Sequence, residues 1–224
     1  MPAEGPLRDG ADAGLRLIET MRWEPGEGLV RRDLHFSRLG GSARALGFAF
    51  APEEIDLRIA AALSGAAGTM RVRLALERDG RATVEARPFT PLPAGTAWRV
   101  RIASARLDSS DPLLRHKTSR RAAYEAARAE FPAHDADEVL LLNEKGELCE
   151  GTITSLFVET GRGLLATPPL ACGLLAGVLR AELIERGKAQ ERTLRPRDLG
   201  GVRCFVGNSL RGLIEARLSP QDAG

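Results

Sequence analysis

Lysine is rare in this chain, and one of its three lysines stands where covalent chemistry is expected. Lys117, Lys145 and Lys188 are the only lysines among 32 lysine and arginine residues. A primary amine can lose its proton near neutral pH and bond to a carbonyl, which a guanidinium cannot do. Lys145 falls in an expected hairpin turn, and Lys188 follows an expected helix. Lys117 lies where an irregular stretch meets a predicted helix, so it is the candidate nucleophile, with a solvated surface lysine as the alternative.

Two other features are suited to binding an anion such as a phosphate. Arg38 lies beside the apolar stripe of a predicted helix, and its planar guanidinium can bind phosphate through two hydrogen bonds. Gly177 precedes a second predicted helix, so the amides of Val178 and Leu179 can point at an anion. Each has an ordinary alternative, since Arg38 can be a partly buried ion-pair residue and a glycine before a helix is common.

Six segments resemble, in the same order, those of the class IV (fold-type IV) pyridoxal-phosphate enzymes. That family includes branched-chain and D-amino-acid aminotransferases and 4-amino-4-deoxychorismate lyase. Any one segment is weak evidence, but their order and their family-like separations make the resemblance strong. The segments are Ile18–Arg22, His35–Leu39, His116-Lys117, Glu150-Gly151 with Ser155–Phe157, Gly177–Arg180 and Asn208–Gly212.

The resemblance implies a role for each segment around pyridoxal 5'-phosphate. Lys117 would form the Schiff base with the cofactor aldehyde, and afterwards act as base and acid with a lowered pKa. Glu150 would keep the pyridine nitrogen protonated, which lets the ring accept electrons. The implied phosphate contacts are Arg38, Gly177, Val178, Leu179, Asn208 and Ser209. His35 and His116 are expected to be structural, and Tyr124 to serve in packing.

Within the family, the chain is most similar to 4-amino-4-deoxychorismate lyase, which releases pyruvate and leaves p-aminobenzoate for folate synthesis. Thr20 matches a threonine that lyases place near the substrate, and Arg211 or Arg22 is a candidate for binding a substrate carboxylate. The segment Thr167–Arg180 is also lyase-like. The alternatives are a class IV aminotransferase acting on a D-amino or branched-chain amino acid, and a relative that binds without turnover.

Three departures from the family pattern put the substrate in doubt more than the cofactor. Only Asp9–Gly14 stands where the family has a longer segment with a substrate-side tyrosine. Ser119-Arg120 replaces a common Leu-Asn after the lysine, and Ser155 replaces a usual asparagine.

The elements that must position these residues predict an α+β fold with two domains, residues 1–93 and 94–224. Alternation predicts a hairpin of strands 70–76 and 82–86 around Asp79-Gly80, and Pro88 to Gly95 is the candidate linker. Helical spacing joins Phe36, Leu39, Ala43, Leu46 and Phe50, and Pro52 opens a second helix. The remaining predicted elements are strands at 15–23, 98–102, 139–142, 156–158, 164–166 and 202–206, helices at 120–131 and 178–185, and a final segment at 213–218.

The run at 139–142 is apolar throughout, as expected for a strand buried on both faces. The resemblance further implies a D-amino-acid-aminotransferase-like enzyme, with a small N-terminal α/β domain and a larger cofactor-binding pseudo-barrel domain. It also implies a homodimer.

Composition excludes several other classes of protein. The net charge is +2, no basic block stands alone and aromatic residues are only 4%, which gives little support to a nucleic-acid surface. No apolar run approaches the roughly 18 residues needed to cross a bilayer, and Met1–Pro6 lacks the features of a signal peptide. The cysteines, 149, 172 and 204, fit neither a disulfide framework nor a zinc site. We therefore expect a reduced, cytoplasmic enzyme with a small-molecule substrate and no metal.

Overall fold

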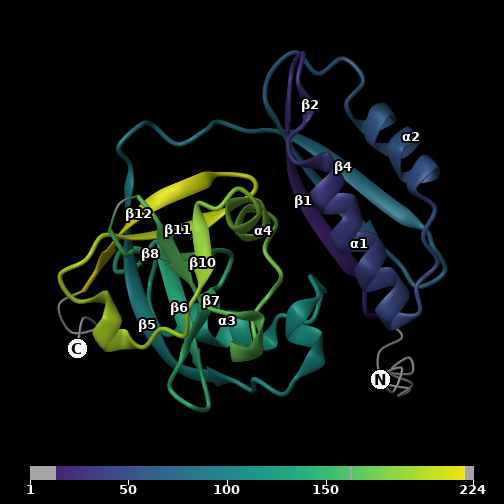
Figure 1. The fold of residues 1–224 in the computed structure, drawn as a ribbon. Coiled ribbons are helices and arrows are strands. Elements are labelled where there is room, and N and C mark those ends of the chain that lie inside the picture. Colours follow the sequence, from purple (N-terminus) through teal and green to yellow (C-terminus); the bar gives the residue numbers. More distant parts are fainter. Residues whose placement is uncertain (1–13, 162, 220–224) are drawn as a thin grey trace. The chain divides into compact units, whose positions relative to one another are not determined.

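The computed structural model describes residues 14–161 and 163–219, which form two compact units (Figure 1). The first unit holds the described residues up to Thr90 together with His116–Arg120. The second holds Pro91–Arg115 and the described residues from Arg121 onwards. The chain therefore returns to the first unit for five residues, and Lys117 is one of them. Met1–Pro6 and residues 9–13, on which the signal-peptide and family-departure predictions rest, lie outside the described residues.

The first unit is an antiparallel sheet with two helices. The strand order is β2-β1-β3-β4, and α1 packs against β1 while α2 packs against β4. The predicted hairpin is confirmed, because Met70 pairs with Pro88 and Leu76 with Ala82. The elements are β1 (Leu17–Glu24), β2 (Gly28–Leu29), α1 (Arg32–Leu46), α2 (Pro52–Ala62), β3 (Met70–Leu76) and β4 (Ala82–Pro88).

The helix α1 ends earlier than its apolar spacing predicts. Gly47 adopts a left-handed conformation with φ of 70°, and Phe48 N–H closes the helix on Ala43 O at 2.8 Å. Glycine takes this conformation without the steric cost that a side chain brings, so it is a common helix terminator. The placement of Phe50 in the helix is therefore wrong. Its ring instead packs edge-on to Phe36, with centroids 6.5 Å apart.

The second unit is built around a closed ring of strands. The sheet order is β10-β9-β8-β11-β12-β5-β6-β7, and an additional pairing of β7 with β8 closes six of these strands into a barrel. This confirms the pseudo-barrel prediction. The elements are β5 (Ala97–Leu107), η1 (Pro112–Arg115), α3 (Ala122–Ala129), β6 (Glu138–Asn143), β7 (Leu148–Gly151), β8 (Ser155–Glu159), β9 (Leu165–Thr167), η2 (Leu170–Cys172), α4 (Val178–Glu185), β10 (Ala189–Glu191), η3 (Pro196–Leu199), β11 (Cys204–Asn208) and β12 (Gly212–Leu218).

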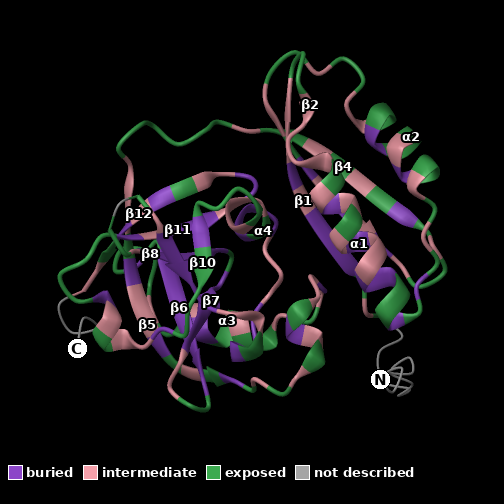
Figure 2. Ribbon diagram, viewed as in Figure 1, coloured by how far each residue is buried: buried purple, intermediate pink, exposed green. Residues whose placement is uncertain are grey.

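Alternate side chains of the barrel strands enter different parts of the core. On β6, Leu140 and Leu142 belong to one cluster with residues of β5, β8, β11 and β12. Val139 and Leu141 belong to another, which includes Ala127 of α3. All six residues of β6 are buried, as the apolar run predicts (Figure 2). A third cluster packs α4 against β8 and β9.

Short elements account for most of the differences from the predicted pattern. The helix α3 covers eight residues, fewer than the predicted 120–131. The strands β2, β7 and β10 have two to four residues and were not predicted. Among the residues that the structure describes, no helix is long and apolar enough to cross a membrane.

Candidate active site

The backbone of Lys117 is held by the first strand of the first unit. Ile18 N–H donates to Lys117 O at 2.8 Å, and Thr118 forms an antiparallel bridge with Leu17. Ser119 adds a backbone bond to Arg16 O at 2.9 Å. Thr118 is buried and Lys117 is half-buried. The segment is thus attached to the start of β1 and to the residue before it, which fixes the position of the Lys117 backbone.

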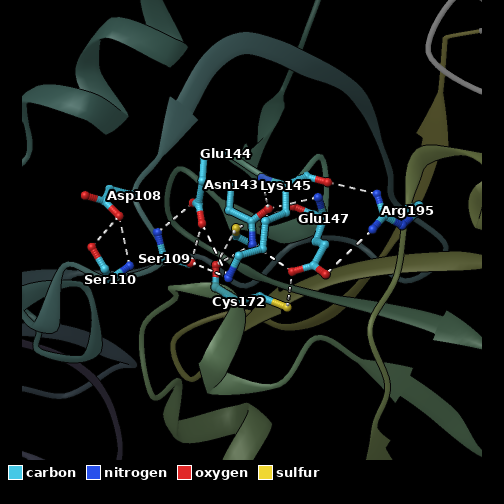
Figure 3. Close-up of polar contacts among 10 residues, drawn as sticks. Asp108, Ser109, Ser110, Asn143, Glu144, Lys145, Glu147, Cys172 and Arg195 are labelled. Carbon is cyan, nitrogen blue, oxygen red and sulfur yellow. Dashed lines mark hydrogen bonds and ion pairs between the residues drawn. The ribbon is translucent and has the colours of Figure 1, made fainter.

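The other two lysines lie in structural settings. Lys145 is in the turn between β6 and β7, where Nζ lies 3.0 Å from Ser109 Oγ and 3.5 Å from Glu144 (Figure 3). Asn143 Oδ1 accepts the backbone N–H of Lys145 at 3.0 Å, which orders the turn. The lysine side chain is 57% exposed. Lys188 is exposed beyond the end of α4. Of the three lysines, only Lys117 lies at a candidate catalytic position.

Arg38 projects from α1 onto a buried carboxylate of β1. Its Nε and Nη2 donate to the two oxygens of Glu19 at 2.8 and 2.6 Å, and His35 Nδ1 lies 2.7 Å from the same carboxylate. Burial alone would raise the pKa of Glu19, but the Arg38 charge and the bonds from His35 and Arg38 outweigh it and lower the pKa to about 2. Arg38 is therefore a partly buried ion-pair residue, and its phosphate role stays a prediction.

The candidate residues of the first unit meet along one stretch of β1. Glu19 binds the Arg38 side chain, and Ile18 binds the Lys117 backbone. Thr20 is the next residue of β1 and pairs with Arg73 of β3. The two histidines have structural contacts, since His35 bonds Glu19 and His116 Nδ1 lies 2.9 Å from Ser42 Oγ. Sequence analysis missed Glu19, although it lies inside the Ile18–Arg22 segment. A carboxylate placed directly after Leu17 and Ile18, in the part of β1 that is buried, is the signal that would have marked it.

In the second unit, Glu150 is a buried carboxylate at the end of β7. Glu150 is only 4% exposed. Its Oε1 accepts hydrogen bonds from Tyr124 Oη at 2.8 Å and from Leu175 N at 3.0 Å. The prediction that Tyr124 serves only in packing was wrong. Burial, and then the Glu150 charge, raises the pKa of Tyr124. The phenol therefore stays protonated and donates a hydrogen bond to Glu150. No local pattern joins residues 26 apart, so sequence analysis missed this contact.

The loop after Glu150 is organised by a second buried carboxylate, Glu138 of β6. Glu138 is fully buried, and both of its oxygens accept hydrogen bonds. The Cβ of a larger residue at Gly151 would lie 2.8 Å from the Glu138 carboxylate, so the chain passes too close for any side chain. The donors to Oε1 are Val139 N, Thr152 N and Thr152 Oγ1, and those to Oε2 are Ile153 N and Thr154 Oγ1.

The same loop leads into Ser155, which lies against the start of α4. Ser155 pairs with Glu150 of β7 and with Gly207 of β11. A Cβ at Gly177 would lie 2.5 Å from Ser155 Oγ, and a Cβ at Gly207 would lie 2.9 Å from Leu179 Cδ2. Ser155 is therefore brought together with the predicted segment at 177–179 and with Gly207, the residue before the predicted segment Asn208–Gly212. A helix N-terminus beside a serine hydroxyl and two side-chain-free glycines is suited to an anion.

Asn208 and Arg211 belong to the tight turn between β11 and β12. Asn208 Nδ2 donates to Ile153 O at 3.1 Å, and its Oδ1 accepts the Arg211 N–H at 2.9 Å. The Asn208 side chain therefore shapes the turn, while Ser209 beside it is buried. The Arg211 guanidinium lies 5.8 Å from the centre of the Trp98 ring. The phosphate contacts of Asn208 and Ser209 and the substrate contact of Arg211 stay predictions.

The chain belongs to the amino-transferase class IV family, whose model matches residues 16–218. It has the class IV fold and is an enzyme of the aminotransferase and aminodeoxychorismate lyase kind. A protein of Schizosaccharomyces pombe, provisionally named an aminodeoxychorismate lyase, is 30% identical over 70% of this chain and 68% of its own length. A crystal structure from Mesorhizobium loti, provisionally named an amino-acid aminotransferase, is 55% identical with a TM-score of 0.90, covering 92% of this chain and 100% of its own. Another, provisionally named a 4-amino-4-deoxychorismate lyase, is 28% identical with a TM-score of 0.78, covering 96% and 91%.

Proposed function

We propose that the protein is a pyridoxal-phosphate-dependent 4-amino-4-deoxychorismate lyase that forms p-aminobenzoate and pyruvate. The family generally uses this cofactor, and the residues present fit it. The observation that carries the cofactor assignment lies in the second unit, where Ser155 pairs with Glu150 across β7 and β8 and its hydroxyl lies against Gly177 at the α4 N-terminus. A buried carboxylate suits a pyridinium nitrogen, and a helix N-terminus suits a phosphate.

Two relatives named as lyases support the choice of reaction. Their similarity covers about 70% and 96% of the chain, at 30% and 28% identity. Lys117 is the proposed catalytic amine. Glu150 is proposed to hold the proton on the ring nitrogen, and the amides at Val178 and Leu179 to bind the phosphate.

When bound, pyridoxal phosphate supplies an electron-withdrawing ring that stabilises negative charge at the carbon beside the substrate nitrogen. Lys117 Nζ takes the proton from the ring carbon that carries the substrate amine. The bond between the substrate ring and the enolpyruvyl oxygen then breaks as the ring becomes aromatic. The departing enolpyruvate gains a proton and becomes pyruvate, which balances the proton that Lys117 removed. Lys117 must be neutral to accept the proton.

An aminotransferase acting on a D-amino or branched-chain amino acid is the second candidate. It is favoured by one observation, the 55% identity to the structure provisionally named an amino-acid aminotransferase. The two reactions differ in the fate of the cofactor. A lyase returns it unchanged in each turnover, whereas an aminotransferase leaves it in the amine form and releases a keto acid.

The first test offers aminodeoxychorismate to the purified protein with and without pyridoxal phosphate. Equimolar p-aminobenzoate and pyruvate, lost in Lys117→Ala and retained in Lys188→Ala, are expected. Borohydride reduction should fix the cofactor to a single peptide, and the three lysines of the chain make that peptide easy to assign. If aminodeoxychorismate gives no product while an added amino acid is converted to its keto acid, the protein is assigned as the aminotransferase instead.

Substrate recognition and assembly belong to the same proposal. Arg211→Ala should raise KM for a carboxylate-bearing substrate with little change in kcat, because a binding contact equal in ground and transition states is lost. An unchanged KM would remove Arg211 from the site. Thr20→Gly tests the lyase-like threonine in the same assay. Sedimentation velocity tests the homodimer that the family resemblance implies.

A further inference from the structure

Two donors from different parts of the second unit bind the Oε1 atom of the Glu150 carboxylate. Tyr124 Oη donates to Oε1 from α3, and Leu175 N donates to the same oxygen from the loop before α4. Hydrogen bonds to a buried carboxylate favour its charged form over its neutral form. The two donors therefore orient Glu150 and oppose its protonation.

The Tyr124 side chain is itself fixed in place. Its ring packs against the cluster that includes Cys149 and Ala127. The Arg121 guanidinium lies 4.7 Å from the ring centre and donates to Thr152 O, in the loop that follows Glu150. A stacked guanidinium and a packed ring leave the phenol one orientation, so the hydroxyl is aimed at Glu150.

The second donor links Glu150 to the proposed phosphate end of the site. Leu175 N binds Glu150, and Leu175 O accepts the N–H of Gly177 at 2.8 Å. Gly177 is the residue that precedes α4. One carboxylate oxygen is thereby joined to both the α3 phenol and the start of α4.

We propose that Tyr124 is a positioning residue that keeps Glu150 ionised, so that the shared proton stays on the ring nitrogen of the cofactor. This rests on the proposed cofactor role of Glu150. In a buried pair of a pyridine and a carboxyl group, the proton can lie on either partner. A donor to the carboxylate stabilises the ion pair, with the proton on nitrogen. Without the Tyr124 hydroxyl, the carboxylate is more basic and takes the proton, which weakens the electron sink.

The test compares the wild-type chain with Tyr124→Phe, which keeps the ring and removes only the hydroxyl, and with Tyr124→Leu, which also removes the ring. Each is loaded with pyridoxal phosphate labelled with ¹⁵N in the ring. In Tyr124→Phe we expect the ¹⁵N resonance to move toward the unprotonated value, and kcat to fall about tenfold to a hundredfold with little change in KM. The Glu150→Gln variant gives the reference for a nitrogen without its carboxylate.

A packing role predicts a different pattern. Tyr124→Phe would then match the wild type in ¹⁵N shift and kcat, and only Tyr124→Leu would be impaired, mainly in stability. That result would overturn the proposal while leaving the cofactor assignment intact.

A second measurement needs no cofactor and separates this proposal from the proposed function. The carboxyl ¹³C resonance of Glu150, assigned by its loss in Glu150→Gln, is titrated in the unloaded chain. It should titrate at a higher pH in Tyr124→Phe than in the wild type. Identical titrations overturn the proposal, whether or not the protein binds pyridoxal phosphate. A wild-type protein that binds none would instead refute the proposed function.

Discussion

Replacing Glu138 should destabilise the loop that follows Glu150. The loss in the free energy of unfolding can be estimated from the hydrogen bonds that Glu138 accepts. Five neutral donors converge on this carboxylate, three on Oε1 and two on Oε2. In Glu138→Gln, the least damaging orientation places the amide nitrogen at the Oε2 position. The Thr154 hydroxyl can rotate to accept from that nitrogen, but Ile153 N–H then faces another donor.

The magnitude follows from the bonds lost and weakened. An unsatisfied donor costs about 1–3 kcal/mol, and the remaining bonds lose the extra strength that a charged acceptor gives them. Relief from burying a charge offsets part of this. We therefore expect a loss of about 2 kcal/mol in the free energy of unfolding for Glu138→Gln. Glu138→Ala, which removes every acceptor, should cost about 4 kcal/mol.

Urea denaturation followed by circular dichroism measures this directly, through the midpoint at an unchanged m-value. The matched control is Glu185→Gln, an exposed carboxylate of the same unit, which should stay within about 0.5 kcal/mol of the wild type. A double-mutant cycle with Thr154→Val should show coupling with Glu138, because the two side chains share a bond of 2.8 Å. A Glu138→Gln protein as stable as the control would refute the argument that this carboxylate organises the loop.

Three further predictions concern the other parts of the site. Because the pKa of Glu19 is lowered from 4.5 to about 2, its contribution is complete above pH 4.5 and is lost as pH falls toward 2. The stability difference between wild type and Glu19→Gln should therefore shrink by about 3 kcal/mol over that window, and a difference independent of pH would refute the ion-pair account. Gly177→Ala should destabilise the unloaded protein by about 1 kcal/mol, since its Cβ would lie 2.5 Å from Ser155 Oγ, and adding Ser155→Ala should restore most of the loss in urea denaturation. Glu150→Gln keeps an acceptor for both of its donors, so its stability should change by less than about 1 kcal/mol while its affinity for pyridoxal phosphate, measured by fluorescence titration, falls.

Elements whose pattern is local could be predicted from the sequence. The β3–β4 hairpin follows from alternation on both sides of Asp79-Gly80, and the structure pairs those strands throughout. The helix α4 begins and ends at the predicted residues, and it starts directly after Gly177. The strand β6 is buried on both faces because the barrel core lies on one side and α3 on the other. In each case the information needed lies within about a dozen residues.

Contacts between distant segments could not be predicted in this way. Barrel closure depends on a short pairing of Glu150 with Ser155, and β7 is too short to show a periodicity. The bond from Tyr124 to Glu150 joins a helix to a strand 26 residues later, and nothing in either segment marks the other. The family resemblance supplied Glu150, because motif order carries information that periodicity does not. It gave no role to Tyr124, whose contact only the fold reveals.

Glu138 and Glu150 show why residue type alone does not assign a role. Both are buried carboxylates on adjacent strands of one barrel, and each stands near a glycine. Both oxygens of Glu138 accept hydrogen bonds, from the neighbouring Val139 N–H of β6 and from the loop 152–154, so its hydrogen bonds are used within the fold. Glu150 instead receives hydrogen bonds at Oε1 from two separate parts of the second unit, Tyr124 of α3 and Leu175 of the loop before α4. We therefore assign Glu138 to the folding of the loop beside it, and Glu150, which is bound from both α3 and the loop before α4, to the proposed cofactor site. Comparing the two glutamine variants, in stability and in cofactor affinity, separates these roles within one protein.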